Sequence, residues 1–202
     1  VDMFDLIEKE HSRLDILVNN AIVHVNMGER GPFLRVTADG WSAFLSKNLD
    51  SLFFVTHCAG RLMAQARSGS IINISSNGAV AAHRQRIAYD TLKGALEAFT
   101  RALAVDLAPW NVRVNALRPC VVADEAPAGS EKDALHQRLG AMIPLGRIAR
   151  PADVAGACVY LASDDAAFVT GQVWNIDGGM LEQSRPPQLE LEPVLGPDEV
   201  DA

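Results

Sequence analysis

The sequence predicts an α/β fold with a mostly parallel sheet and helices packed against it. Two observations lead to this prediction. Short segments that are apolar at nearly every position recur along the chain, as expected of strands covered on both faces. Stretches of helix length with periodic apolar residues separate these segments, and such alternation is typical of parallel strands joined by crossover helices.

Four apolar segments are the predicted strands, and they comprise residues 16–18, 71–74, 112–117 and 173–176. Branched aliphatic residues dominate them, as in buried strands. A helix is expected to end near His11, just before the first strand, because apolar side chains there recur at i, i+3 and i+4 among charged residues.

Three longer helices are predicted further along the chain. Thr37 has the composition of an N-cap, and a periodic stretch follows over residues 41–66. The stretch over residues 87–107 is apolar or small on most sides, which is typical of a helix packed against both a sheet and a neighbour. The last helix opens at Pro151, where the first turn tolerates proline, and is expected over residues 151–162.

Two regions have a different composition. Residues 121–146 show poor periodicity with frequent Gly, Pro and charges, so they are predicted to form a mobile flap over a substrate. Residues 181–202 combine four prolines with six acids and one arginine, which is typical of disordered segments. The chain is therefore divided into one domain over residues 1–180 and a tail over residues 181–202.

The charge and composition disfavour several functional classes. Six acids and one arginine give the tail −5 of the formal charge of −7, so residues 1–180 carry only −2 and nucleic acid is not an expected partner. No apolar run approaches the ~20 residues that span a bilayer, and no secretory signal is visible. Neither the three scattered cysteines nor the five histidines have metal-ligand spacing. We expect a cytoplasmic protein with reduced thiols and no metal.

One constellation of side chains suggests chemistry. Tyr89 and Lys93 are four residues apart, so a helix places the phenol and the ammonium on one face. Ser76 follows the end of the preceding strand. A hydroxyl, a phenol and an ammonium in one cleft suit proton transfer to or from a carbonyl or alcohol oxygen, because the ammonium stabilises an ionised phenol.

Taken singly, each of these residues has an ordinary structural interpretation, but other landmarks accompany them in a fixed order. The landmarks are Leu17-Val18-Asn19-Asn20-Ala21, Asn48-Leu49, Asn73-Ile74-Ser75-Ser76, Tyr89 with Lys93, Val112-Arg113-Val114-Asn115-Ala116 with Pro119, Pro144-Leu145-Gly146-Arg147, Thr170-Gly171-Gln172 and Asp177-Gly178-Gly179. Over residues 1–180 this series resembles the short-chain dehydrogenase/reductase family. Ser76 precedes Tyr89 by thirteen residues (89 − 76), as that family expects.

The resemblance implies a doubly wound, Rossmann-like sheet and an oxidoreductase that uses NAD or NADP on a small alcohol or carbonyl compound. It also implies a catalytic tetrad of Asn48, Ser76, Tyr89 and Lys93. Tyr89 would be the general acid in reduction and the base in oxidation, while Ser76 would hydrogen-bond the substrate oxygen. Lys93 would bind the nicotinamide ribose and assist the phenol, and Asn48 would help to hold a water in a proton relay.

Cofactor contacts follow from the same resemblance. Asn20 and Ala21 would border the adenine ribose, and Val122, three residues after Pro119, would meet the carboxamide through its backbone. An equally good interpretation of Asn20 is a side chain that ties neighbouring strands together. The implied cofactor-binding residues are Asn20, Ala21, Tyr89, Lys93, Pro119 and Val122.

The sequence also departs from the family pattern. No glycine-rich phosphate-binding turn precedes residue 16, so we interpret the chain as N-terminally truncated by two β-α units, roughly 60 to 70 residues. The first predicted strand would then be an exposed edge. Ile22, Cys120 and Asp124 occupy positions where the family usually has Gly, Gly and Thr.

Two functional hypotheses therefore stay open. The chain is either an oxidoreductase or a catalytically inactive fragment or pseudoenzyme that retains only oligomerisation surfaces. A Ser-His hydrolase is excluded because no G-x-S-x-G motif is present. A homodimer or homotetramer is expected, because the two long helices are more apolar than one sheet face can cover. His83 and Arg84 are candidates for substrate contact, while the substrate and the choice between NAD and NADP stay open.

Overall fold

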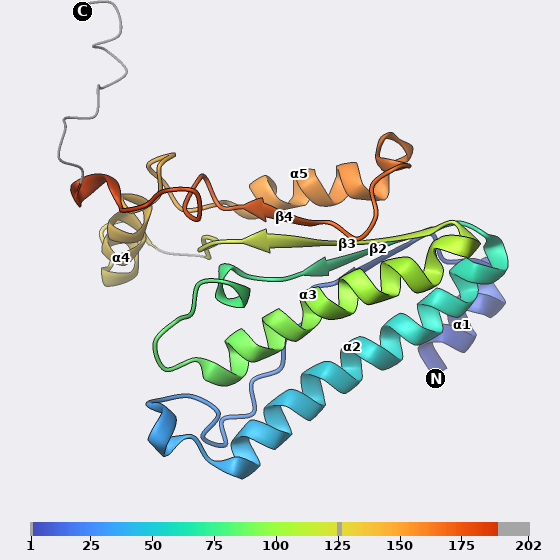
Figure 1. The fold of residues 1–202 in the computed structure, drawn as a ribbon, viewed down its shortest axis with the longest axis horizontal. Helices are drawn as coiled ribbons and strands as arrows, with labels where there is room; N and C mark the ends of the chain where they lie inside the picture. The colour runs from blue at the N-terminus through green and yellow to red at the C-terminus, as the bar shows by residue number, and fades with distance from the viewer. Residues whose placement is uncertain (1, 125–126, 190–202) are drawn as a thin grey trace, which may run out of the picture.

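A computed structural model describes residues 2–124 and 127–189, and it places one four-stranded sheet between helices (Figure 1). The predicted strands and long helices are present, mostly within three residues of their expected bounds. The helices and strands are α1 (Asp2–His11), β1 (Ile16–Asn19), α2 (Ala38–Ala66), β2 (Gly69–Ile74), α3 (Ile87–Leu107), β3 (Val112–Pro119), α4 (Glu131–Gly140), α5 (Pro151–Ala162) and β4 (Val173–Ile176).

The sheet confirms the predicted α/β architecture. Its strands lie in the order β1-β2-β3-β4, and every neighbouring pair is parallel. Helices α2 and α3 cover one face and α5 covers the other (Figure 1). The strand arrows point to the left in Figure 1, and α4 lies at that end. The loops that leave the carboxyl ends of the strands therefore gather at one end of the molecule.

Alternate residues of β2 build the core on the two faces of the sheet. Ile71 is fully buried in a cluster with Met63 of α2 and Ala104 of α3. Its neighbour Ile72 is fully buried on the opposite side, in a cluster that contains Leu161 of α5. Successive side chains of a strand point to opposite faces, so this central strand needs apolar residues at consecutive positions. That requirement explains the uninterrupted apolar segments in the sequence.

A chain of buried polar side chains fixes the sheet to α2 and α3. Asn19 Nδ2 donates to Asn73 Oδ1 at 2.8 Å and to Thr56 Oγ1 at 3.0 Å. Asn73 Nδ2 in turn donates to Thr100 Oγ1 at 2.8 Å. The strand-tying role considered for Asn20 therefore belongs to Asn19, one residue earlier. Because each bond joins a different pair of elements, the network fixes their relative positions.

Helix α2 is the longest element and begins as expected. Thr37 is its N-cap, and its Oγ1 accepts a hydrogen bond from the backbone N–H of Gly40 at 3.0 Å. The helix ends where Arg67 adopts the left-handed conformation. Among the residues that the structure describes, no helix is long and apolar enough to cross a membrane.

The predicted mobile flap over residues 121–146 contains a helix, α4, which the poor periodicity did not indicate. Ser130 caps this helix, and its Oγ accepts from the N–H of Asp133 at 3.1 Å. The ten-residue helix is largely polar, and Leu135 is 49% exposed. A short helix with little buried surface produces no apolar stripe, which is why periodicity missed it.

The first part of the predicted tail contacts the segment that follows α4. Gln183 Nε2 donates to the carbonyl oxygen of Met142 at 2.8 Å, and Gln188 donates to that of Ala141. A short 3-10 turn covers Pro187–Leu189. The rest of the expected tail, residues 190–202, lies outside the described residues.

The core can be tested by matched truncations in neighbouring strands. Ile72→Ala should lower the free energy of unfolding by about 2 to 5 kcal/mol, because it leaves a cavity between the sheet and α5. Ile16→Ala is the control, since Ile16 is 46% exposed on β1 and should cost about 1 kcal/mol or less. Urea denaturation followed by circular dichroism measures both. Equal losses would contradict the placement of β2 at the centre.

Candidate active site

The candidate site lies at the carboxyl end of β2. This strand ends at Ile74, and polar residues 75–77 follow it at once. Helix α3 begins at Ile87 and carries Tyr89 and Lys93 in its first two turns. Open α/β sheets bind ligands in the crevice outside the carboxyl ends of their strands, so these side chains lie where a ligand site is expected.

Lys93 joins the strand end to the helix. It is 6% exposed, and its Nζ donates a hydrogen bond to the carbonyl oxygen of Ile74 at 2.7 Å. The same Nζ lies 5.7 Å from the centre of the half-buried Tyr89 ring. Burial lowers the pKa of Lys93 to about 8. Within residues 2–124 and 127–189 no carboxylate forms an ion pair with this ammonium, so two of its three N–H groups remain for a ligand.

Ser76 presents a hydroxyl that is still able to donate. It is buried and caps a short 3-10 turn, Asn77–Ala79, where its Oγ accepts from the N–H of Gly78 at 3.2 Å. A serine hydroxyl that accepts one bond keeps its own hydrogen for another partner. Ser76 can therefore donate to an oxygen of a bound molecule.

A buried ion pair supports the backbone just before Ser76. Ser75 Oγ donates to Glu97 Oε1 of α3 at 2.7 Å. Arg118 of β3 donates two hydrogen bonds to the same carboxylate, from Nε to Oε1 at 2.8 Å and from Nη2 to Oε2 at 2.7 Å. Burial alone raises the pKa of Glu97, but the bonds from Arg118 and Ser75 outweigh it and hold the pKa below its usual value. Glu97 stays ionised at neutral pH and joins α3 both to β3 and to the residue that follows β2.

Ser76 and Tyr89 line a common cavity of about 480 Å³, which we call the tyrosine cavity. This volume lies within the ~300 to 1,000 Å³ typical of small-molecule sites. Its lining comprises Ser76, Asn77, His83, Arg84, Arg86, Tyr89, Cys120, Val121, Leu139 and Met180.

Lys93 lines a second cavity of about 260 Å³, which we call the strand-end cavity. Asn20, Ala21 and Asn48 line it too, so three of the sequence-predicted contacts meet the predicted lysine there. The four tetrad residues are thus divided between two cavities. Tyr89 in one and Lys93 in the other are neighbours on α3, and this pair forms the junction between the cavities.

Asn48 has a structural task in addition to its place in the cavity wall. Its Nδ2 donates to the carbonyl oxygens of Val23 at 2.9 Å and Phe44 at 2.8 Å, and its Oδ1 accepts from the N–H of Val23 at 2.9 Å. These bonds fasten the segment after β1 to α2. One lone pair of Oδ1 stays available, so the bonds are compatible with a water contact.

Pro119 and Val122, the two predicted cofactor contacts from this region, lie at the end of β3 and three residues beyond it. Pro119 is the last residue of that strand, and Val122 pairs with Ala149 in an isolated parallel bridge. The two hydrogen bonds of that bridge use the carbonyl of Val121 and the N–H of Ala123. The peptide groups of Val122 itself are not used in it. Neither Pro119 nor Val122 lines the tyrosine cavity, whereas Cys120 and Val121 between them do.

The structure places His83 and Arg84 in the lining of the tyrosine cavity, as the sequence suggested. The carboxylate of Asp90 holds the loop, because Oδ2 accepts from the backbone N–H of His83 at 2.7 Å and Oδ1 lies 2.8 Å from its Nδ1. The guanidinium of Arg86 lies 5.8 Å from the centre of the Tyr89 ring. A basic loop therefore forms one wall of the cavity.

Sequence reasoning did not single out five of the lining residues, which are Asn77, Arg86, Val121, Leu139 and Met180. Asn77 directly follows Ser76, so its position at a strand end was an available signal. Leu139 belongs to α4, the helix that periodicity failed to predict. Met180 follows Gly178-Gly179, and its sulfur lies 3.7 Å from Asn77 Nδ2. Local patterns could not show that these distant segments meet.

The three departures from the family pattern have separate environments. Ile22 packs beside the buried Phe44 and also lines the strand-end cavity. Cys120 is half-buried, and burial raises the pKa of its thiol. The carboxylate of Asp124 lies 2.6 Å (Oδ2) from Nζ of Lys132 and 3.2 Å (Oδ1) from Nε2 of His136. Across the part of the chain that the structure describes, no three His, Cys, Asp or Glu side chains are grouped to hold a metal ion.

Comparison with known proteins gives consistent matches. A family model described as enoyl-(acyl carrier protein) reductase matches residues 1–181. The 3-oxoacyl-[acyl-carrier-protein] reductase FabG of Chlamydia trachomatis is 34% identical over 171 residues, which are 85% of this chain and 67% of the relative. A glucose and ribitol dehydrogenase homolog of Oryza sativa is 36% identical over 174 residues, 83% of this chain and 57% of the relative. The chain spans 57 to 67% of the length of these relatives.

Solved structures share the fold. A gluconate 5-dehydrogenase from Burkholderia cenocepacia, in complex with NADP and tartrate, matches with a TM-score of 0.78 and 31% identity. The match covers 89% of this chain and 69% of that one. An NAD+-bound xylitol dehydrogenase matches with a TM-score of 0.78 and 28% identity, over 88% of this chain and 73% of the other.

The buried ammonium gives a testable dependence of stability on pH. Since burial lowers the pKa of Lys93 from 10.5 to about 8, the folded chain binds fewer protons than the unfolded chain between these values. The free energy of unfolding should therefore gain a component on the order of 3 kcal/mol as pH rises from about 8 to 10.5.

Lys93→Met should lack this component, because the methionine side chain does not titrate. Urea unfolding of both proteins at a series of pH values measures the difference, and the lost bond to Ile74 contributes an offset independent of pH. Parallel pH profiles for the two proteins would show that Lys93 is not desolvated.

Proposed function

Because the chain belongs to the short-chain dehydrogenase/reductase family, we propose that it transfers hydride between a nicotinamide dinucleotide, NAD or NADP, and a small alcohol or carbonyl compound. One observation carries this proposal. The hydroxyl of Ser76 and the phenol of Tyr89 line one cavity, while the buried ammonium of Lys93 lies 5.7 Å from the Tyr89 ring. This arrangement combines a proton donor, a hydrogen-bond donor and a cation at one place.

The side chains have complementary tasks in such a reaction. Tyr89 gives a proton to the carbonyl oxygen in reduction and takes it from the alcohol in oxidation. Ser76 donates a hydrogen bond to the same oxygen through the hydrogen that its capping bond leaves free. Lys93 stabilises the ionised form of the phenol by its charge. Positioned acid-base groups of this kind contribute about 10² to 10⁴-fold to a rate.

The strand-end cavity has the donor set for the ribose of a nicotinamide nucleotide. Lys93 has two unused N–H groups, Asn20 and Ala21 line the wall beside it, and Asn48 holds that wall to α2. When bound, the nicotinamide supplies or accepts the hydride. The xylitol dehydrogenase bound to NAD+ and the gluconate 5-dehydrogenase bound to NADP support a dinucleotide of this class.

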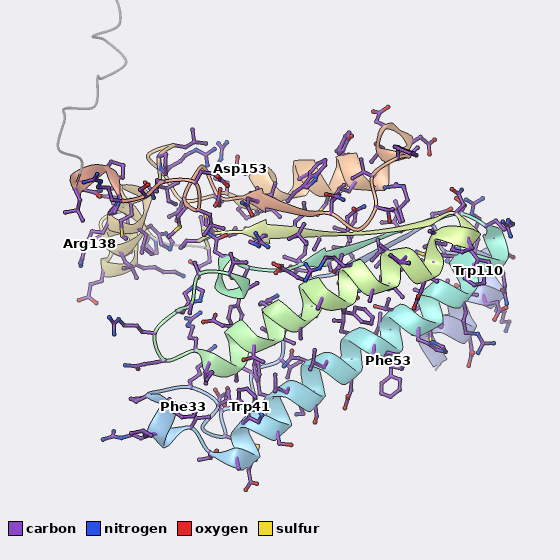
Figure 2. The ribbon with its side chains drawn as sticks, viewed as in Figure 1. Phe33, Trp41, Phe53, Trp110, Arg138 and Asp153 are labelled. Atoms are coloured by element: carbon purple, nitrogen blue, oxygen red, sulfur yellow. The ribbon has the colours of Figure 1, made fainter. Side chains whose placement is uncertain are left out.

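We also infer that the chain forms a homodimer or homotetramer through α2 and α3. Phe53 is 49% exposed and Trp110 is 42% exposed, and an apolar groove lined by Leu103 and Leu107 separates the two helices. Figure 2 shows the Phe53 ring standing clear of α2, away from the sheet. A second copy of the chain would remove these aromatic side chains from water.

The catalytic assignment is tested by removing one oxygen atom. Tyr89→Phe should reduce turnover by at least about 10²-fold, because the proton donor is lost while the ring still packs. It should leave dinucleotide affinity unchanged, whereas Lys93→Met should weaken both turnover and affinity. Dinucleotide titrations followed by tryptophan fluorescence measure affinity, since Trp41 packs in the same cluster as Tyr89.

Normal turnover of Tyr89→Phe would overturn the mechanism. A native chain that binds neither NAD nor NADP would instead favour the alternative of an inactive member of the family. The two failures are distinguishable because turnover and dinucleotide affinity are measured separately on the same protein preparation.

The association surface is tested by one matched pair of substitutions. Phe53→Glu should shift the chain to monomer in analytical ultracentrifugation, because it places a charge on the proposed contact surface. Phe33→Glu is the control, since Phe33 is 69% exposed but lies on the short turn before α2. A monomeric native chain, or equal effects of the two substitutions, would contradict the proposed surface.

A further inference from the structure

The buried ammonium of Lys93 lies one helical turn from a carboxylate with which it does not pair. Glu97 follows Lys93 by four residues on α3, so the two side chains share one face of the helix. They bond to consecutive residues at the end of β2, because Lys93 Nζ donates to the carbonyl oxygen of Ile74 and Ser75 Oγ donates to Glu97 Oε1. Opposite charges at this spacing can form an ion pair. No ion pair joins these two described residues.

Arg118 accounts for the missing pair. It reaches Glu97 from β3, and its Nε and Nη2 donate to the two carboxylate oxygens at 2.8 Å and 2.7 Å. Its Nη1 donates to Asn175 Oδ1 at 2.8 Å, which joins the guanidinium to β4 as well. A planar guanidinium matches both oxygens of a carboxylate, whereas an ammonium is a point charge without that match. The bonds from Arg118 and Ser75 therefore occupy both oxygens of Glu97.

The other carboxylate within one turn of Lys93 is also occupied. Asp90 precedes Lys93 by three residues on α3, and both of its oxygens contact His83. Burial lowers the pKa of Lys93 to about 8, and among the described residues no carboxylate offsets that effect. Each acid of α3 near Lys93 thus has a basic partner from another segment.

The remaining surroundings of Lys93 add no negative charge. Lys93 is the one charged residue in the described lining of the strand-end cavity, and the positions that α2 contributes to it, 48, 51, 52 and 55, are uncharged. On the other side of Tyr89 the nearby charge is a cation, since the guanidinium of Arg86 lies 5.8 Å from the centre of that ring. The placement of Glu97 therefore decides the charge balance at Lys93.

We propose that Arg118 is a positioning residue that holds the Glu97 carboxylate away from Lys93 and so keeps the ammonium available to a bound molecule. Without Arg118, Glu97 turns to the cation one helical turn away and takes up one of its N–H groups. Lys93 then has fewer donors for a ribose and a weaker effect on the phenol of Tyr89. The use of the ammonium rests on the proposed function, whereas the separation of the two charges is a property of the chain alone.

Titration of Lys93 by NMR tests the proposal without a substrate. The chain has four lysines, at positions 9, 47, 93 and 132, so selective 13Cε labelling gives four signals, and Lys93→Met assigns one of them. Its midpoint should lie near pH 8 in the native chain. Arg118→Gln removes the charge but keeps an N–H donor for Glu97. It should raise the midpoint by at least about one pH unit, because a carboxylate within ~4 to 6 Å favours the charged amine. An unchanged midpoint would overturn the proposal.

A double variant separates the released carboxylate from the mere loss of a cation. Arg118→Gln with Glu97→Gln should return the midpoint to its native value, because the carboxylate is gone. A midpoint that stays raised would refute the role of Glu97. Arg113→Gln is the control in the same strand, since Arg113 bonds to the carbonyl oxygens of Ser163 and Val169, and it should leave the midpoint unchanged. Circular dichroism checks folding, and Arg118→Met, with the same expected midpoint, replaces Arg118→Gln if that variant unfolds.

Dinucleotide binding shows whether the available ammonium serves the proposed function. Arg118→Gln should weaken the binding of NAD or NADP by at least about threefold, because one donor of Lys93 is lost, and the double variant should bind as the native chain does. An unchanged affinity beside a raised midpoint would contradict the proposed benefit to a bound molecule.

The two readouts distinguish this inference from the proposed function. If the Lys93 midpoint moves as expected but the native chain binds neither dinucleotide, the charge separation stands and the oxidoreductase assignment falls. If the native chain binds a dinucleotide and turns over alcohols while Arg118→Gln leaves the midpoint in place, the oxidoreductase assignment stands and this inference falls.

Discussion

The hydrogen bond from Lys93 Nζ to the carbonyl oxygen of Ile74 is the contact on which the rest of the site depends. It joins the last residue of β2 to the second turn of α3, and so sets where the strand-end loop starts relative to Tyr89. A buried ammonium without a carboxylate partner is costly, and that cost is visible in the lowered pKa of Lys93. The fold tolerates it because one oriented carbonyl dipole stabilises the charge.

Rigid polar contacts surround this bond on both sides. The bonds of Asn19, Asn73 and Thr100 link the two strands to α3, and the carboxylate of Glu97 holds Ser75 and Arg118. Each group is buried or partly buried and hydrogen-bonded, so a shift of one element would leave several polar atoms without partners. The strand end therefore acts as a fixed platform, whereas the loop that carries the two cavity arginines is exposed. The residues proposed for catalysis lie on or next to this platform, and the arginines of the cavity wall lie on the loop.

Much of this could be predicted from the sequence, because strand burial and helix packing leave direct patterns. The run Ile71-Ile72 showed a strand covered on both faces, and the spacing of Tyr89 and Lys93 showed the shared helix face. The polar α4 left no such pattern, and Leu139 was missed with it. Asn77 was missed too, although its position directly after Ser76 at the end of β2 was a usable signal. The division into a domain and a tail stays a prediction.

The open edge of the sheet has a consequence for how specificity is distributed along the chain. Strand β1 is an edge among the described strands, and its residues 17–19 help to line the strand-end cavity, whereas no residue of β1 lines the tyrosine cavity. Any polypeptide that pairs with β1 would border the strand-end cavity and not the tyrosine cavity. If the two cavities take the dinucleotide and the substrate as proposed, the two preferences would lie on separate parts of the chain, and recombination could exchange one without the other.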